Sequence, residues 1–125
     1  MIEDNLLNLY EVKKDGEGFD EGADYTINVI NEQSFECMKY NVLPSFPTFS
    51  QMIIISKGVI DGEQIDAVRY QSPTHMTGWW LTTDYYDGNT SSLKTIHYYH
   101  IAFKRPDIVK HLALPFGFRF FLVRN

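Results

Sequence analysis

The chain has 125 residues, of which 44% are hydrophobic and 15% aromatic, and its formal net charge is −5 at pH 7. This length fits one ordinary domain, so we expect residues 1–125 to fold as a single domain around a hydrophobic core. The net negative charge argues against nucleic acid as a partner, because phosphate binding needs a basic face. The single cysteine, Cys37, excludes an intramolecular disulfide, and its apolar neighbours favour a buried structural thiol.

Neither a secretion signal nor a membrane-spanning segment is predicted. The chain begins Met1-Ile2-Glu3-Asp4, without the positive region and apolar stretch of a signal. Its longest apolar runs are about four residues, as in residues 52–55, far short of a membrane span. We therefore expect a cytoplasmic protein that does not bind a membrane.

Charge is distributed unevenly along the chain. Residues 1–24 contain eight acidic and two basic side chains, a net charge of −6 that leaves about +1 for residues 25–125. We expect this stretch to be an acidic and mobile N-terminal segment of the domain. Such a segment can also steer a basic partner toward the protein.

The first part of the chain predicts one helix and one hairpin. Apolar side chains recur at helical spacing within residues 2–14, which indicates a short helix. Residues 25–30 and 35–42 alternate and are rich in β-formers, so we expect two strands that pair across the short polar break between them. Pro44 and Pro47 then enforce a loop.

The middle of the chain carries its strongest hairpin signal. Residues 52–60 favour a buried strand and residues 65–71 an alternating one, with Asp61-Gly62 between them. Because Asp-Gly favours the tight turn of a hairpin, we expect these two strands to pair. A further strand follows over residues 79–83.

The last third of the chain mixes helix and strand. Residues 93–103 fit both a helical face and a strand alternation, and both assignments stay open. Pro106 begins a helix over residues 106–113, and residues 118–123 close the chain as a strand. The expected fold class is α+β, a mostly antiparallel sheet built from hairpins with short helices packed on one side.

No catalytic, nucleotide or cofactor motif is present in the sequence. The chain lacks Gly-x-Ser-x-Gly, a phosphate-cradling glycine loop and a dinucleotide fingerprint. A helix would bring His97 and His100 to one face, but no third ligand is near them. We therefore expect neither a bound metal nor a cofactor.

A turn with acidic and aromatic residues follows the tryptophan strand. Its candidate contact residues, taken together with the strand residue Trp80, are Asp84, Tyr85, Tyr86 and Asp87. Two interpretations are open. The two carboxylates could perform acid–base chemistry with a histidine, which would need shifted pKa values in a cleft. Alternatively the turn is an interaction surface, because Tyr and Trp are enriched at binding hot spots. Successive strand residues point to opposite faces, so at least one of the two adjacent tryptophans belongs to the core.

A series of short motifs occurs in order along the second half of the chain. They are Ser56-Lys57-Gly58-Val59, Asp61-Gly62, Arg69-Tyr70, Gly78-Trp79, Leu93-Lys94-Thr95-Ile96, Pro106-Asp107-Ile108-Val109, Leu112, Pro115-Phe116-Gly117 and Phe120. In this order and spacing the sequence resembles the immunity protein 33 family over about residues 55–120. The first 50 residues carry no part of this resemblance.

The resemblance implies a bacterial immunity protein of a polymorphic toxin system. Such a protein stays in the cytoplasm and neutralises a cognate toxin by stoichiometric occlusion, without catalysis or a cofactor, and its gene typically lies beside the toxin gene. Family members follow Gly-Trp with a dense acidic run, whereas residues 81–87 here are Leu-Thr-Thr-Asp-Tyr-Tyr-Asp. Because immunity proteins diversify where they contact their toxins, this departure points to residues 80 and 84–87 as the toxin-binding surface.

Three functions are therefore compatible with the sequence. The first is an immunity protein whose partner is a cognate protein toxin, for example a basic nuclease or another effector domain. The second is a non-catalytic adaptor domain that binds a ligand or a protein. The third is a small hydrolase that uses Asp84, Asp87 and a histidine.

Overall fold

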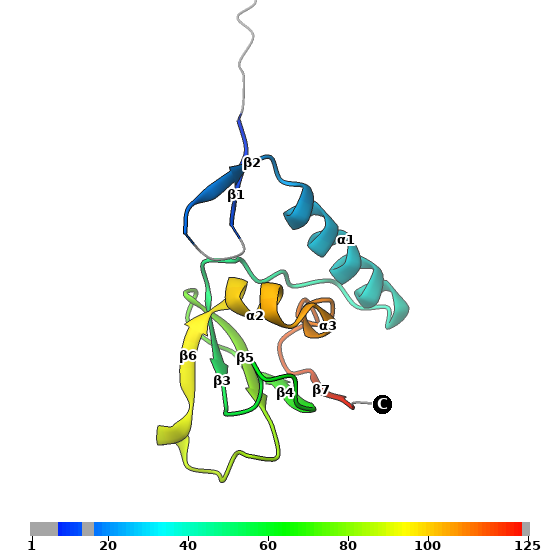
Figure 1. Ribbon diagram of the computed structural model, residues 1–125. Helices are drawn as coiled ribbons and strands as arrows, with labels where there is room; N and C mark the ends of the chain where they lie inside the picture. The colour runs from blue at the N-terminus through cyan, green and yellow to red at the C-terminus, as the bar shows by residue number, and fades with distance from the viewer. Residues whose placement is uncertain (1–7, 14–16, 124–125) are drawn as a thin grey trace, which may run out of the picture.

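A computed structural model describes residues 8–13 and 17–123 of the chain. Part of the helix expected within residues 2–14 lies outside these ranges, and residues 10–12 form a strand instead. β1 (Tyr10–Val12) pairs antiparallel with β2 (Phe19–Glu21) in a separate two-stranded sheet. This hairpin stands beyond the larger sheet, at the top of Figure 1.

A long helix, α1 (Asp24–Lys39), replaces the hairpin that was expected over residues 25–42. Its buried residues are Val29, Gln33, Glu36 and Cys37, which lie on one face of the helix. Gln33 is polar, which breaks the apolar pattern that would have indicated a helix, and the hairpin prediction was wrong for that reason. The Gln33 side-chain amide donates to the Val109 carbonyl at 2.8 Å and to the Tyr98 hydroxyl at 2.9 Å. Gln33 therefore fastens α1 to the rest of the core.

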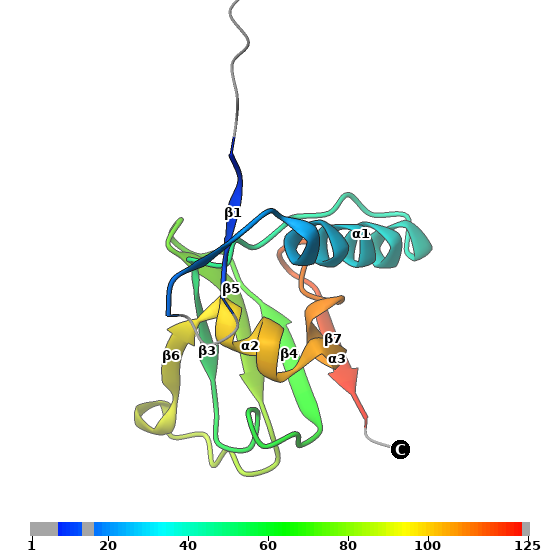
Figure 2. The same cartoon turned by 45° about the horizontal axis from the view of Figure 1, so that its top comes forward.

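The larger sheet has five strands in the order β6-β3-β5-β4-β7. The strands are β3 (Met52–Ile55), β4 (Ile65–Arg69), β5 (Met76–Thr82), β6 (Lys94–His97) and β7 (Arg119–Leu122). β3 and β5 run parallel and the other three pairs are antiparallel, so the sheet is mixed. The helices α2 (Tyr98–Lys104) and α3 (Pro106–Val109) lie with α1 on one side of it (Figures 1 and 2). This arrangement confirms the α+β class.

β3 and β4 do not form the expected hairpin, because β5 lies between them in the sheet. β3 ends at Ile55, and residues 56–64 form a folded connection, the β3–β4 loop. Arg105, which is 5% exposed, donates from Nη1 to the carbonyls of Val59 at 2.7 Å and Glu63 at 3.0 Å. This contact with the α2–α3 junction holds the loop in place, and it outweighs the preference of Asp-Gly for a hairpin turn.

The segment 93–103, for which both assignments stayed open, contains one element of each kind. β6 ends at His97 and α2 begins at the next residue. The helix expected over residues 106–113 is shorter, since α3 ends at Val109 and turns follow it. The closing strand is confirmed, because β7 lies within residues 118–123.

The core lies between the sheet and the helices. Trp79, Ile53 and Leu81 are fully buried on the helix side of the sheet, and Ile101 and Leu112 are fully buried opposite them. The expectation for Cys37 is also confirmed, because this thiol is 1% exposed. Burial raises the pKa of the Cys37 thiol, which keeps it protonated and unreactive.

A buried arginine, Arg69, joins separate parts of the chain in this core. It is 2% exposed, and its Nε donates to the Thr77 carbonyl at 2.9 Å. Its Nη1 donates to the carbonyls of Ser45 at 2.7 Å, Leu114 at 2.8 Å and Leu112 at 3.3 Å. No carboxylate within the described ranges lies within 4.0 Å of it. Backbone carbonyls therefore stabilise this buried charge without a counter-ion.

Candidate functional site

The face of the five-stranded sheet that points away from the helices carries Trp80 at its centre; we call it the open face. β5 is the middle strand, and the register partners of Trp80 are Ile54 on β3 and Val68 on β4. Trp80 is half-buried, and its ring contacts the Tyr70 ring edge-on at 5.7 Å between centroids. Trp79 is fully buried on the other face, which confirms that one of the two tryptophans belongs to the core.

The open face has a polar and aromatic border on its β4–β7 side. Arg119 and Asp66 form a bidentate pair, Nε–Oδ1 at 3.0 Å and Nη2–Oδ2 at 2.7 Å. The Arg119 guanidinium lies 4.7 Å from the centre of the Phe121 ring, which is 63% exposed. An apolar, aromatic centre with a polar rim is the usual composition of a protein interface.

The turn after β5 holds the other candidate residues. Thr83 organises this turn through two hydrogen bonds. Its carbonyl accepts a hydrogen bond from the Tyr86 backbone N–H at 3.0 Å, and its hydroxyl oxygen accepts one from the Tyr85 backbone N–H at 3.2 Å. The Thr83 hydroxyl also donates to the Lys57 carbonyl, which ties the turn to the β3–β4 loop. Asp87 Oδ1 accepts from the Asn89 backbone N–H at 2.8 Å.

The two tyrosines of this turn point in different directions. Asp84 and Tyr86 line a hollow of about 440 Å³ together with Asp66 and Phe121, beside the open face. Tyr85 instead contacts the β3–β4 loop, and its Cδ2 lies 2.9 Å from where a side chain at Gly58 would begin. The structure thus places Asp84 and Tyr86 at the border of the open face and Tyr85 on the neighbouring loop end.

Asp84 and Asp87 are exposed and form no ion pair within the described part of the chain. No described histidine lies within 4.0 Å of either carboxylate. The closest histidine–carboxylate pair is elsewhere: His111 Nδ1 lies 3.0 Å from Oε1 of the buried Glu36. The arrangement needed for a hydrolase based on Asp84, Asp87 and a histidine is therefore absent from the described residues.

No metal was expected at His97 and His100, because a third ligand is missing from the neighbouring sequence. His97 is the last residue of β6 and His100 lies in the first turn of α2, with 6.2 Å between their ring centres. Burial, and then the neighbouring His97 and Lys104, lower the pKa of His100. Across the described ranges no group of three or more His, Cys, Asp or Glu side chains could hold a metal ion. No helix there is long and apolar enough to cross a membrane.

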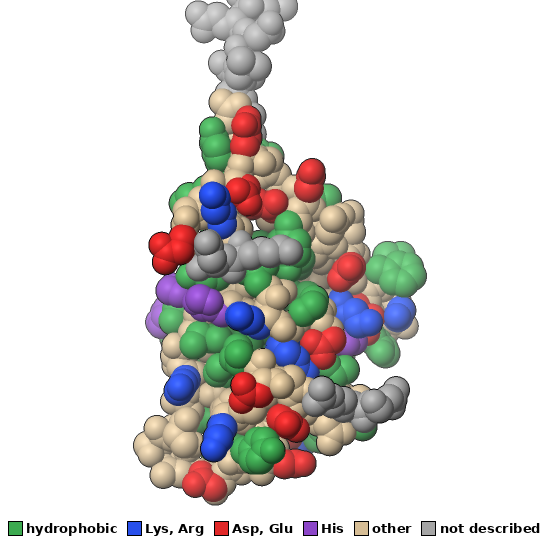
Figure 3. All heavy atoms as spheres, in the orientation of Figure 1, with side chains coloured by type: hydrophobic (Ala, Val, Ile, Leu, Met, Phe, Trp, Pro, Cys, Tyr) green, Lys and Arg blue, Asp and Glu red, His purple; other side chains and the backbone are tan. Residues whose placement is uncertain are grey.

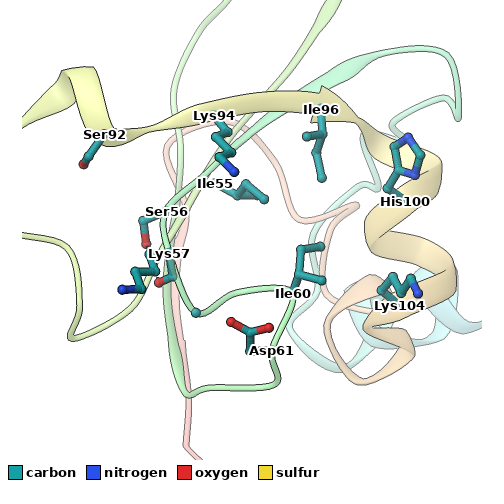
Figure 4. A pocket seen from close by; sticks show the side chains of 11 residues that line it. Ile55, Ser56, Lys57, Ile60, Asp61, Ser92, Lys94, Ile96, His100 and Lys104 are labelled. Atoms are coloured by element: carbon teal, nitrogen blue, oxygen red, sulfur yellow. Dashed lines mark hydrogen bonds between the residues drawn. The ribbon is translucent and has the colours of Figure 1, made fainter.

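Sequence reasoning missed a hollow of about 740 Å³ between β6, the β3–β4 loop and α2, which we call the lysine pocket (Figure 4). Its lining includes the apolar residues Ile55, Ile60 and Ile96 and the basic residues Lys57, Lys94 and Lys104. In Figure 3, basic side chains surround hydrophobic ones on this face of the molecule. Lys57, Asp61 and Lys94 belong to the short motifs singled out in the sequence, but only the folded chain brings these motifs together around one hollow.

A family model described as Imm33-like domain matches residues 32–125 of the chain. No curated protein and no solved structure matches it. The matched range starts within α1 and contains the whole five-stranded sheet, the turn after β5 and the lysine pocket. It extends the resemblance, which the sequence motifs had carried over about residues 55–120, toward both ends of the chain.

Proposed function

We infer the function of this chain from its family, because the chain belongs to the Imm33-like family. We propose that it is a bacterial immunity protein that binds a cognate protein toxin in the cytoplasm and neutralises it by stoichiometric occlusion. Residues 1–125 act as one domain in this role, without a cofactor. The family itself supports a protein partner in general, and the surface features below support a specific mode of binding.

The observation that carries the proposal is the open face with Trp80 at its centre. The α-helices of residues 17–123 all lie on the other side of the sheet, so Trp80, Ile54 and Val68 form a half-buried apolar strip on a rigid scaffold. A rigid aromatic residue at the centre of such a strip is a typical interface hot spot. Removing this surface from water on binding provides the favourable free energy of association.

The acidic turn beside the open face supports a basic partner. Asp84 and Asp87 have no ion-pair partner in the described part of the chain, and the whole chain has a net charge of −5. Unpaired exposed carboxylates accelerate the encounter with a positively charged surface. A nuclease toxin fits this pattern, because an active site that binds nucleic acid is basic.

The decisive experiment is co-expression of the tagged chain with the protein encoded by the neighbouring gene. A one-to-one complex after affinity purification and size exclusion, together with rescue of growth when both are produced, would support the proposal. A neighbouring product that is toxic but is neither bound nor neutralised by this chain would refute it.

Single substitutions then test the surface in that complex. Alanine at the toxin-binding anchors Trp80 or Tyr86 should weaken binding by about 30–1,000-fold, the typical loss of 2–4 kcal/mol for a central anchor. Tyr85→Ala tests whether the contact extends onto the β3–β4 loop. Tyr10→Ala is the matched control, since Tyr10 is 59% and Tyr85 60% exposed and Tyr10 lies on β1, in the separate two-stranded sheet. Asp84→Ala should mainly slow association, and more so at low salt.

A further inference from the structure

The lysine pocket lies away from the open face that carries the toxin contact proposed above, and shares with that site only the β3–β4 loop, which Tyr85 contacts at Gly58. It opens beside the edge strand β6, on the helix side of the sheet, where α2 leaves the strand uncovered (Figure 4). Its volume of about 740 Å³ lies within the range of roughly 300–1,000 Å³ that is typical of small-molecule sites.

The apolar part of the pocket comes from three isoleucines on separate elements. Ile55 ends β3, Ile96 lies on β6, and Ile60 belongs to the β3–β4 loop. Ile60 is 39% exposed although it is a large aliphatic side chain. Together these residues offer an apolar surface that an apolar ligand would remove from water.

The charged part of the pocket is predominantly positive. Lys57, Lys94 and Lys104 line it together with a single acid, Asp61, which gives a formal charge of +2 in a chain of net charge −5. Within the described ranges none of the three lysines forms an ion pair. Figure 4 shows Lys94 pointing into the pocket, with Lys57 and Lys104 at opposite sides of its rim.

The other polar groups of the wall are already engaged or carry no charge at neutral pH. The Ser56 hydroxyl oxygen accepts from the Thr83 backbone N–H at 3.0 Å, and Ser56 is 5% exposed. The Ser92 hydroxyl donates to the Asn89 carbonyl at 2.7 Å. His100 also lines the pocket; burial lowers its pKa, so its imidazole is neutral at neutral pH and keeps a single N–H donor. The three ammonium groups are therefore the charged donors of the wall.

We propose that the lysine pocket binds an organic anion with an apolar body, the chemistry of a medium-chain carboxylate. The carboxylate pairs with Lys94, and the hydrocarbon chain lies on the three isoleucines. Asp61 faces the ligand from the β3–β4 loop. Its carboxylate repels the anion, and it disfavours a ligand that carries a second negative charge. This proposal does not depend on the toxin contact.

The test uses octanoate as the probe, with the purified full-length chain. A titration followed by two-dimensional ¹H–¹⁵N NMR should show saturable shifts at the amides of Ile60, Lys94 and Ile96. We expect a Kd below about 1 mM, since a small ligand with a buried chain and one ion pair reaches this affinity. Octan-1-ol and octylammonium, which have the same chain and no negative charge, should bind at least about tenfold more weakly.

Variants that neutralise one charged side chain each show where in the pocket the carboxylate binds. Lys94→Gln should weaken octanoate binding by roughly threefold, the effect of one partly exposed ion pair, and Asp61→Asn should tighten it by a similar factor. Ile60→Ser should weaken binding through lost apolar contact. Lys110→Gln is the matched control, because it removes the same charge from an exposed site outside the pocket. Circular dichroism confirms that each variant folds.

The outcomes are decisive either way. The proposal would be supported if the chemical-shift changes are confined to the pocket and the octanoate affinity falls in Lys94→Gln but rises in Asp61→Asn. Absence of saturable binding at millimolar octanoate would overturn it, as would equal binding of octan-1-ol or shifts centred on Trp80 instead of β6. None of these results bears on the toxin complex, whose test uses a different partner and a different surface.

Discussion

Replacement of Arg69 by methionine should destabilise the protein by about 3 kcal/mol, which is large for one residue in a domain of ordinary stability. Methionine fills a similar volume and removes the charge. It leaves the carbonyls of Ser45 and Leu114 without the guanidinium donor that they have in the native protein. The Leu112 carbonyl is less affected, because the Trp79 indole N–H also donates to it at 2.8 Å.

The magnitude follows from two opposing contributions. The three shorter hydrogen bonds of Arg69 involve a charged donor and contribute about 2 kcal/mol each, roughly 6 kcal/mol in all. Burial lowers the pKa of Arg69 to about 10, which corresponds to a cost of roughly 3 kcal/mol for holding the charge in the core. The Arg69→Met protein lacks these hydrogen bonds but also avoids the cost of the buried charge, so the net loss of stability is about 3 kcal/mol.

Urea unfolding, followed by circular dichroism and tryptophan fluorescence, measures this loss as a lower midpoint at unchanged m-value. Arg119→Met is the matched control, because Arg119 is exposed and its pair with Asp66 should contribute about 1 kcal/mol or less. Arg69→Lys should cost at least as much as Arg69→Met, since lysine keeps the charge but lacks the planar fork of donors.

Two results would refute this reasoning. An Arg69→Met protein as stable as Arg119→Met would mean that the core carbonyls do not depend on the guanidinium. Full stability in Arg69→Lys would mean that positive charge alone, without the hydrogen-bond geometry, stabilises this part of the core.

Three further predictions concern single residues. Trp79→Ala should lower the free energy of unfolding by about 3–5 kcal/mol and Trp80→Ala by about 1 kcal/mol, and similar urea midpoints for the two would contradict their assigned faces. Gly78→Ala should lower Tm strongly, because φ is +87° and the added methyl would lie 2.3 Å from the Tyr70 carbonyl oxygen; an unchanged Tm would disprove this. Burial lowers the pKa of His111 more than Glu36 raises it, so below the ordinary pKa of 6.5 the unfolded chain binds a proton that the folded protein resists. Stability should therefore fall as the pH is lowered through 6.5, and less so in His111→Gln, as Tm against pH would show.

The strands of the second half were predictable because their patterns are local. β4 alternates between buried and half-buried positions, β5 does so from Trp79 to its end, and the composition of both favours strands. The order of the strands was not predictable in the same way. β5 lies between β3 and β4, so pairing depends on contacts of the intervening loop with Arg105, a residue more than 40 positions away from Val59. No turn dipeptide encodes such a contact.

The candidate site was also predictable only where it depends on neighbouring residues. Strand alternation correctly separated Trp79 from Trp80, because it depends only on neighbouring residues. The directions of Tyr85 and Tyr86 depend on Thr83 and on the β3–β4 loop, so their divergence could not be predicted from neighbouring residues alone. The lysine pocket escaped notice because Lys57, Lys94 and Lys104 meet only in the folded chain.

The adjacent positions of Trp79 and Trp80 make the protein its own spectroscopic reporter. These are the only two tryptophans of the chain, and one is fully buried while the other is half-exposed on the open face. In a Trp79→Phe variant the emission maximum comes from Trp80 alone and reports how far the open face is exposed to water. In a Trp80→Phe variant it comes from Trp79 alone and reports whether the core is folded. Quenching by iodide would distinguish the two indoles directly, and protection of Trp80 from the quencher would register any protein that covers that face, without a label.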